Sequence, residues 1–248
     1  MATLTVYPDP NVETSTVDGW TRRNVFATPQ TFNDLMAGAG TDVNDITTTD
    51  QAPQINSFST SGNYYRVRRC IFLFDTSSLT SGATISDAVL SIKIGAKSNG
   101  FSTAPDYDIV SSTTASNTSL ATGDHTGYGT TAFASIAYAS LSTSVYNDFT
   151  LDANGIANIS KTSISKFGAR WSWDRTSTEP TWVTNTAVDA DTIFADTANT
   201  TSDPKLVITY TVAVGPANLK TYNTNATANI KSINTNLIAN SKSLNTNV

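Results

Sequence analysis

Several short segments of this chain alternate apolar and polar side chains with a period of two, and this pattern most constrains its fold. In residues 89–94, the side chains of Leu90, Ile92 and Ile94 fall on one face of an expected strand. One packed face and one solvated face are typical of antiparallel sheets. The same alternation, or a nearly continuous apolar run, predicts further strands at residues 2–7, 69–74, 107–110, 148–151 and 205–212. Turn-forming residues separate the segments at 77–82, 98–100, 153–155 and 202–204.

The composition also favours strands over helices. Charged residues make up 14% of the chain, against about 25% in a typical soluble domain. Thr, Ser and Asn take their place, and these side chains compete with the hydrogen bonds of a helical backbone. The sequence therefore predicts an all-β fold, a jelly-roll-type antiparallel β-sandwich with one or two short helices.

Helices are expected in two segments. Residues 29–36 carry apolar side chains at positions i, i+3 and i+4. Thr28 is the expected N-cap, Pro29 the first helical residue and Gly38 the residue that stops the helix. The second segment, residues 157–165, has a less regular pattern.

The chain divides after its last predicted strand into a body, residues 1–212, a linker, residues 213–216, and a tail, residues 217–248. The tail holds three copies of an 11-residue repeat, each with Ala-Asn, Lys and Asn-Thr-Asn in register.

Within each repeat, Asn-Thr-Asn favours turns, so we expect short extended segments joined by turns. One repeat cannot bury its few apolar side chains alone. The tail must dock on the body, wrap with copies of itself or remain an unpacked tether. The side chains that would mediate assembly are Leu219, Tyr222, Ile230, Ile233, Leu237 and Leu244.

Two parts of the sequence resemble known groups of proteins. Residues 66–79 and 82–92, with the closing segment 203–211, are similar to DNRLRE-type domains, which are β-sandwich modules related to carbohydrate-binding modules. This resemblance implies a core strand, its turn and the last strand of such a sandwich. Residues 6–9, 16–19, 166–174 and 179–182 are similar to proteins of phages and metagenomic bacteria that carry an Asn-Ile-Lys-type repeated tail. That resemblance implies a component of a virion or a surface appendage.

The charge and hydropathy of the chain limit its partners. The net charge of −5 offers no basic surface for nucleic acid or anionic lipid. No segment approaches the roughly 18 apolar residues of a membrane span, so no membrane insertion is expected. The N-terminus lacks the basic start and apolar run of a secretory signal. We expect synthesis in the cytoplasm and a final location on a virion or an extracellular surface, reached by another route.

Catalytic motifs are scarce. His125, the only histidine, lies in a Gly- and Thr-rich segment and is expected to be a solvated loop residue. Cys70, the only cysteine, lies in an apolar run and is expected to be buried. One histidine and one cysteine cannot form a zinc site by themselves, and no Gly-x-Ser-x-Gly motif accompanies His125. We therefore predict no catalytic residues, although paired carboxylates could still serve a glycosidase.

Calcium is the one cofactor that the sequence allows. Asp189 and Asp191 are separated by one residue, and Asp42 and Asp45 flank Val43-Asn44. Clustered oxygen ligands suit Ca²⁺, but neither pair matches an EF-hand loop. Solvated acidic loops are the favoured alternative.

Tryptophan supplies the remaining candidate for a binding site. Sugars stack their C–H faces on flat aromatic rings, while charged or amide side chains bind the hydroxyl groups. The glycan-binding candidates are Trp171, Trp173, Trp182, Trp20, Arg170, Asp174 and Glu179. In a strand, Trp171 and Trp173 would share one face. Core packing is the favoured alternative for that pair, because aromatic residues dominate core energetics, whereas Trp182 and Trp20 are candidates for exposure.

Three functions follow from these features. The leading hypothesis is a non-catalytic structural or adhesive component of a virion or appendage, whose C-terminal repeats mediate homo-oligomerisation or attachment to neighbouring subunits. The alternative is a lectin-like, glycan-binding module. A polysaccharide-degrading enzyme is the third hypothesis.

Overall fold

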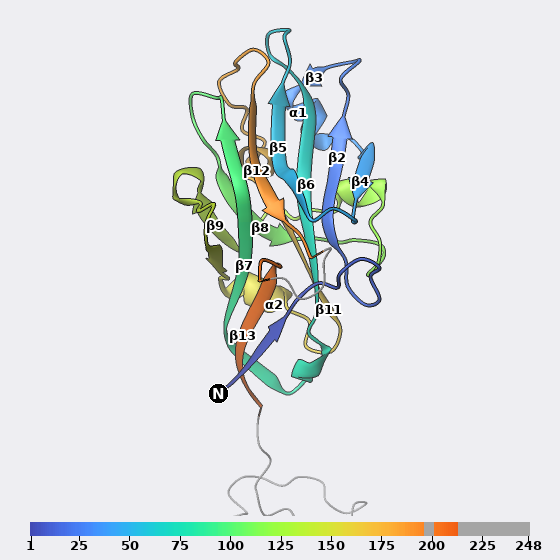
Figure 1. Cartoon of the computed structure of the whole chain (residues 1–248), viewed down its shortest axis with the longest axis vertical. Helices are drawn as coiled ribbons and strands as arrows, with labels where there is room; N and C mark the ends of the chain where they lie inside the picture. Colours follow the sequence, from blue (N-terminus) through green and yellow to red (C-terminus); the bar gives the residue numbers. More distant parts are fainter. Residues whose placement is uncertain (196–200, 213–248) are drawn as a thin grey trace, which may run out of the picture. The chain divides into compact units, whose positions relative to one another are not determined.

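Antiparallel strands account for most of the regular structure in the computed structural model, which describes residues 1–195 and 201–212 (Figure 1). Within these residues the strands are β1 Ala2–Val6, β2 Asp18–Asn24, β3 Gln30–Thr31, β4 Asp42–Asn44, β5 Thr49–Ser57, β6 Asn63–Asp75, β7 Ala83–Asn99, β8 Asp106–Ser111, β9 Ala134–Ala137, β10 Tyr146–Thr150, β11 Ile164–Trp171, β12 Ala187–Ile193 and β13 Lys205–Val212. The helices are α1 Phe32–Ala37, α2 Ala153–Asn158 and α3 Ser172–Thr176, with 3-10 turns η1 Ser77–Leu79, η2 Thr122–Thr126 and η3 Tyr138–Ser140. All these elements belong to one unit, Met1–Val212. The predicted tail and its six apolar candidates lie outside the described residues.

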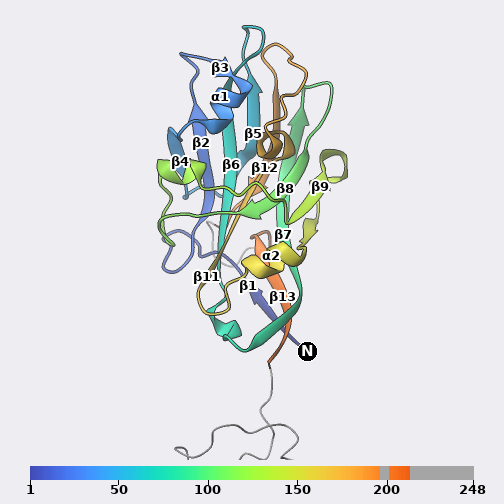
Figure 2. The same cartoon turned by 180° about the vertical axis from the view of Figure 1, so that it is seen from behind.

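Two long strands turn the sheet into a sandwich. Strand β7 pairs with β13 and β10 through residues 83–93 and with β12 through residues 94–99. Strand β6 pairs with β5 through residues 64–68 and with β11 through residues 70–75. Because each long strand changes partner along its length, the sheet curls and divides into layers. Strands β7, β12, β5, β6 and β2 form one layer, with β11, β8 and β9 behind it (Figures 1 and 2). The all-β, jelly-roll-type prediction is confirmed.

Two of the predicted strands lie inside much longer ones. Residues 89–94 are the middle of β7, and residues 69–74 are the second half of β6. Leu90, Ile92 and Ile94 are buried, as their alternation predicts. Cys70 is also buried, and burial raises the pKa of its thiol to about 12.

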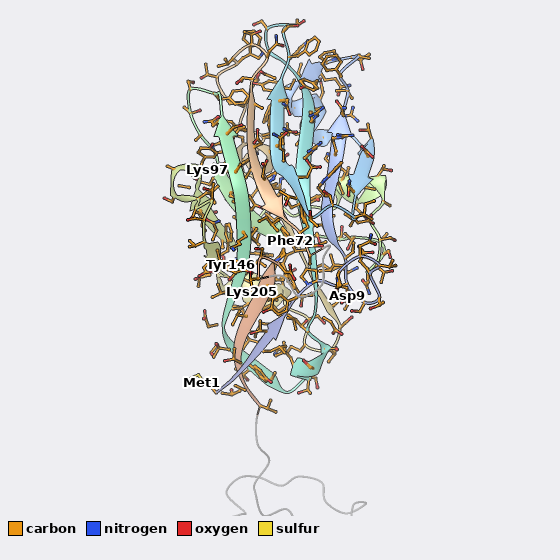
Figure 3. The ribbon with its side chains drawn as sticks, in the orientation of Figure 1. Met1, Asp9, Phe72, Lys97, Tyr146 and Lys205 are labelled. Atoms are coloured by element: carbon orange, nitrogen blue, oxygen red, sulfur yellow. The ribbon has the colours of Figure 1, made fainter. Side chains whose placement is uncertain are left out.

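Side chains on the outer surface also connect neighbouring strands. Lys205 on β13 and Tyr146 on β10 lie side by side (Figure 3), with the Lys205 Nζ 4.3 Å from the centroid of the Tyr146 ring. The Tyr146 hydroxyl donates to the carbonyl of Asp203, 2.9 Å away. These contacts hold the start of β13 against β10 across β7.

The first helix begins later than its sequence predicts. Residues 30–31 pair with β6 as strand β3, so the backbone is still extended at the predicted helical positions. The N-cap is Thr31 rather than Thr28, and its Oγ1 accepts a hydrogen bond from the Asp34 N–H. Gly38 ends the helix as predicted.

The other two helices differ from the prediction of a helix at residues 157–165. Helix α2 begins at Ala153, because the Oδ1 of Asp152 caps it by accepting the Gly155 N–H at 2.8 Å. Residues 153–155, predicted as a turn, form the start of this helix, and β11 already begins at Ile164. Helix α3 was not predicted. It follows β11 without an intervening loop.

Candidate functional site

Trp171 and Trp173 belong to the core. Trp171 ends β11 and α3 begins at the next residue, so the two tryptophans do not share the face of a strand as predicted. Trp171 is 1% exposed and packs edge-to-face on Tyr107 with 5.5 Å between ring centroids. Trp173 is 8% exposed and makes the same contact with Phe101 at 5.5 Å. Neither ring has a free face on which a sugar could stack, so the core alternative holds for this pair.

Trp20 is buried as well, which contradicts its expected place in an exposed loop. It lies in β2, and the guanidinium carbons of Arg22 and Arg68 are 5.1 and 4.5 Å from its ring. Trp182 is partly buried and packs against the core, while Glu179 is exposed in the same loop. The four tryptophans therefore do not form one common stacking surface.

Arg170 and Asp174, in contrast, are brought together in a buried ion cluster. Asp174 is 2% exposed and lies between two arginines. The Nε and Nη2 of Arg69 donate to Asp174 Oδ2 and Oδ1 at 2.7 and 2.6 Å, a bidentate pair. The Nη2 of Arg170 donates to Asp174 Oδ1 at 2.9 Å and to the carbonyl oxygen of the same residue. Arg69, on β6, was not singled out in the sequence because it is 105 residues from Asp174.

The electrostatics of this cluster favour the charged carboxylate. Burial alone would raise the pKa of Asp174, but the charges of Arg69 and Arg170 outweigh burial and hold this pKa below its usual value. The pKa of Arg170 is lowered, chiefly by burial. Asp174 is therefore ionised at neutral pH and neutralises one of its two arginines.

His125 is not the solvated loop residue that the sequence predicts. It is fully buried, its Nδ1 lies 3.0 Å from the Thr21 hydroxyl, and that hydroxyl lies 3.1 Å from the hydroxyl of Tyr128. Burial, and then the charge of Arg69, lower the pKa of His125 to about 3, so the imidazole is neutral. The Thr21 side chain is equally buried. A substrate cannot reach this hydroxyl–imidazole pair without displacing core residues.

Three of the four aspartates in the two acidic pairs have protein partners of their own, Asp42, Asp45 and Asp189. Asp42, in β4, forms an ion pair with Arg22, and Asp45 Oδ2 accepts the Leu120 N–H at 2.9 Å. Asp189 and Asp191 lie on β12 and not in a solvated loop, and Asp189 accepts the Ser98 hydroxyl at 2.7 Å. Burial raises the pKa of both β12 carboxyls. Within residues 1–195 and 201–212, no group of three or more His, Cys, Asp or Glu side chains is placed to hold a metal ion.

Three aromatic side chains that the sequence did not point to form a partly exposed cluster, which we call the aromatic end: Phe26, which is exposed, and Phe58 and Tyr65, which are half-buried. The Phe26 ring centroid lies 5.3 Å from that of Phe58 and 5.1 Å from that of Tyr65, both edge-to-face. Phe26 is nevertheless 61% exposed. The cluster lies beyond β2 and around the β5–β6 turn, at one end of the sandwich (Figure 1). No motif links positions 26, 58 and 65, so only the pairing of β2 and β5 with β6 reveals it.

No model of a known protein family matches this chain, and no curated protein matches it. Among the described residues, no helix has the length and apolar character that a membrane span requires.

Proposed function

We propose that this chain is a non-catalytic adhesive module of a virion or an extracellular surface appendage, and that it contacts a glycan through the aromatic end. The observation that carries this proposal is the exposure of Phe26 within a packed aromatic cluster. Single exposed apolar residues are ordinary on protein surfaces, but a cluster of large rings at one end of a domain favours a contact surface.

The geometry of the aromatic end suits sugar rings. Edge-to-face packing of Phe58 against Tyr65, with 5.9 Å between ring centroids, limits the motion of both rings. A rigid aromatic platform loses little conformational entropy on binding. The guanidinium carbon of Arg66 lies 5.3 Å from the Tyr65 ring and supplies hydrogen-bond donors for hydroxyl groups next to that platform.

Replacing Phe26 with alanine tests this surface. We expect the intact chain to bind members of a glycan array and Phe26→Ala to bind them about 30-fold or more weakly, because truncating an aromatic anchor costs about 2 kcal/mol or more. The unfolding midpoint should barely change, since the ring is largely exposed. Val145→Ala is the matched control, because Val145 is 59% exposed and lies outside the aromatic end. A blank array with the intact chain, or unchanged binding by Phe26→Ala, would refute the proposal.

The C-terminal repeats support an additional role in assembly. Three copies of one 11-residue unit give a chain several equivalent contacts, and short repeats of this kind bury their apolar side chains only by stacking on something else. The charge of the tail fits this role. The sequence of residues 217–248 contains three lysines, Lys220, Lys231 and Lys242, and no acidic residue, whereas the body is acidic.

Removing residues 217–248 tests the assembly role. We expect the intact chain to form an oligomer and the truncated chain to be monomeric, as measured by multi-angle light scattering over a range of concentrations. The thermal unfolding of the body, Met1–Val212, serves as the control, because a truncation that also unfolds the body says nothing about assembly. An unchanged oligomeric state with a folded body would show that the repeats do not mediate self-association.

A further inference from the structure

A cavity of about 230 Å³ lies between helix α1, strand β6, helix α3 and the segment 126–130. Its buried lining consists of Met36, Arg69, Tyr128, Arg170 and Asp174. Its exposed rim consists of Asn33, Ala37, Thr126, Thr130 and Ser177, and the partly exposed Arg175 completes the lining. The cavity is thus charged at its base and polar at its mouth.

The charges around this cavity do not cancel. Arg69 and Arg170 share the single carboxylate of Asp174. Arg175 is neutralised separately by Asp108, and the neutral imidazole of His125 adds no charge. One positive charge therefore remains at the buried base of the cavity, on a chain whose formal net charge is −5. An uncompensated buried charge is costly, and a bound anion would remove that cost.

A hydrogen-bond donor at the base is also unused. Arg170 is 7% exposed, and both of its hydrogen bonds to Asp174 come from Nη2. Its Nε is buried and has no hydrogen-bond partner among the residues that the structure describes. Leaving a buried donor unpaired costs about 1–3 kcal/mol. Asp174 engages only the Nη2 of Arg170, so the guanidinium of this cavity-lining arginine is incompletely paired.

We propose that this cavity binds the carboxylate group of a small organic acid of the size of one uronic sugar. A planar guanidinium matches a carboxylate in shape and charge. One carboxylate would neutralise the positive charge that Asp174 leaves on Arg69 and Arg170. The volume lies below the roughly 300 Å³ at which pockets for drug-sized ligands begin, so the ligand is small. The rim side chains of Asn33, Thr130 and Ser177 offer partners for its hydroxyl groups. None of the residues of the aromatic end lines this cavity, so the inference is independent of the proposed function.

Isothermal titration calorimetry of the full chain with glucuronate tests the proposal, with glucose and sulfate as probes at matched ionic strength. We expect glucuronate to bind with 1:1 stoichiometry and glucose, which has the same ring without the carboxylate, to bind at least tenfold more weakly. No glucuronate binding, or equal affinity for glucuronate and sulfate, would overturn the proposal.

Two variants locate the binding. Arg170→Gln should weaken glucuronate binding about tenfold or more. It should still fold, because Asp174 keeps its bidentate pair with Arg69.

Asn33→Trp should block the mouth of the cavity without altering any charge. Asn154→Trp is its matched control, since each asparagine is the exposed second residue of a short helix. Binding that survives Asn33→Trp, or is lost equally in Asn154→Trp, would contradict the assigned site. Phe26→Ala should leave glucuronate binding unchanged, which separates this site from the aromatic end.

Discussion

Replacing Asp174 with alanine is expected to lower the free energy of unfolding by about 3–5 kcal/mol, because the change leaves two buried arginines without their carboxylate. Arg69 is 3% exposed and loses two of its hydrogen bonds, while Arg170 loses its side-chain partner. Their mutual repulsion then adds to the cost of burial. Urea unfolding at pH 7, followed by tryptophan fluorescence, measures the effect.

Asp87→Ala is the matched control, since Asp87 is an exposed carboxylate on β7 and its loss should change stability by no more than about 0.5 kcal/mol.

The pH dependence of the stability difference gives a second test. The pKa of Asp174 is lower in the folded state than in the unfolded state, so its stabilising contribution is present above the unfolded pKa of 3.8 and is lost as the pH falls through the folded pKa. The difference between wild type and Asp174→Ala should therefore shrink in strong acid. His125 is present in both proteins, so its own titration largely cancels from this difference. Equal stability of the two proteins at pH 7 would contradict the structural role of the cluster.

Replacing Trp171 with alanine is expected to cost about 3–5 kcal/mol, the range for removing a large aromatic side chain from a packed core. The ring is 1% exposed and contacts Tyr107 and Tyr138, with centroid distances of 5.5 and 6.0 Å. The Tyr107 side chain is itself fully buried, so it has little room to move into the cavity that the substitution leaves. Thermal unfolding measured by circular dichroism reports the loss.

Two further substitutions separate packing from recognition. Trp171→Phe retains a ring and removes an indole N–H that has no partner among the described residues, so it should cost clearly less than alanine. Trp182→Ala should also cost less, because Trp182 is only partly buried against the core. If Trp171→Ala retained full stability but lost glycan binding, the ring would belong to a binding surface and not to the core.

The local sequence pattern was sufficient to predict the positions of several strands in the body. Alternating apolar residues predicted β13 at its observed bounds and identified the middle of β7, because one face of each strand meets the core. The bounds of longer strands could not be predicted in this way. Strand β7 extends to Asn99 since its last residues gain hydrogen bonds from β12, about 90 residues away along the chain.

Local sequence signals were insufficient to predict the start of helix α1 and the existence of helix α3. Gly38 ends α1 as its chemistry predicts, but Thr31 replaces Thr28 as the N-cap because pairing with β6 keeps residues 30–31 extended. Helix α3 spans five residues, and Trp171, its N-cap, makes no capping hydrogen bond through its side chain. A helix of five residues is too short to show the recurring apolar positions by which a helix is recognised in a sequence.

The sequence by itself determined the class of fold, the burial of Cys70 and the presence of the repeats, because these follow from residue type and spacing along the chain. The tertiary structure alone decided which polar and aromatic residues meet. It buried Trp20 and His125, which the sequence predicted to be exposed. It also brought Arg69 to Asp174 and Phe26 to Tyr65. The physical reason is that strand pairing acts between segments distant in sequence, and burial depends on the partner strand and the opposing layer as much as on the residue itself.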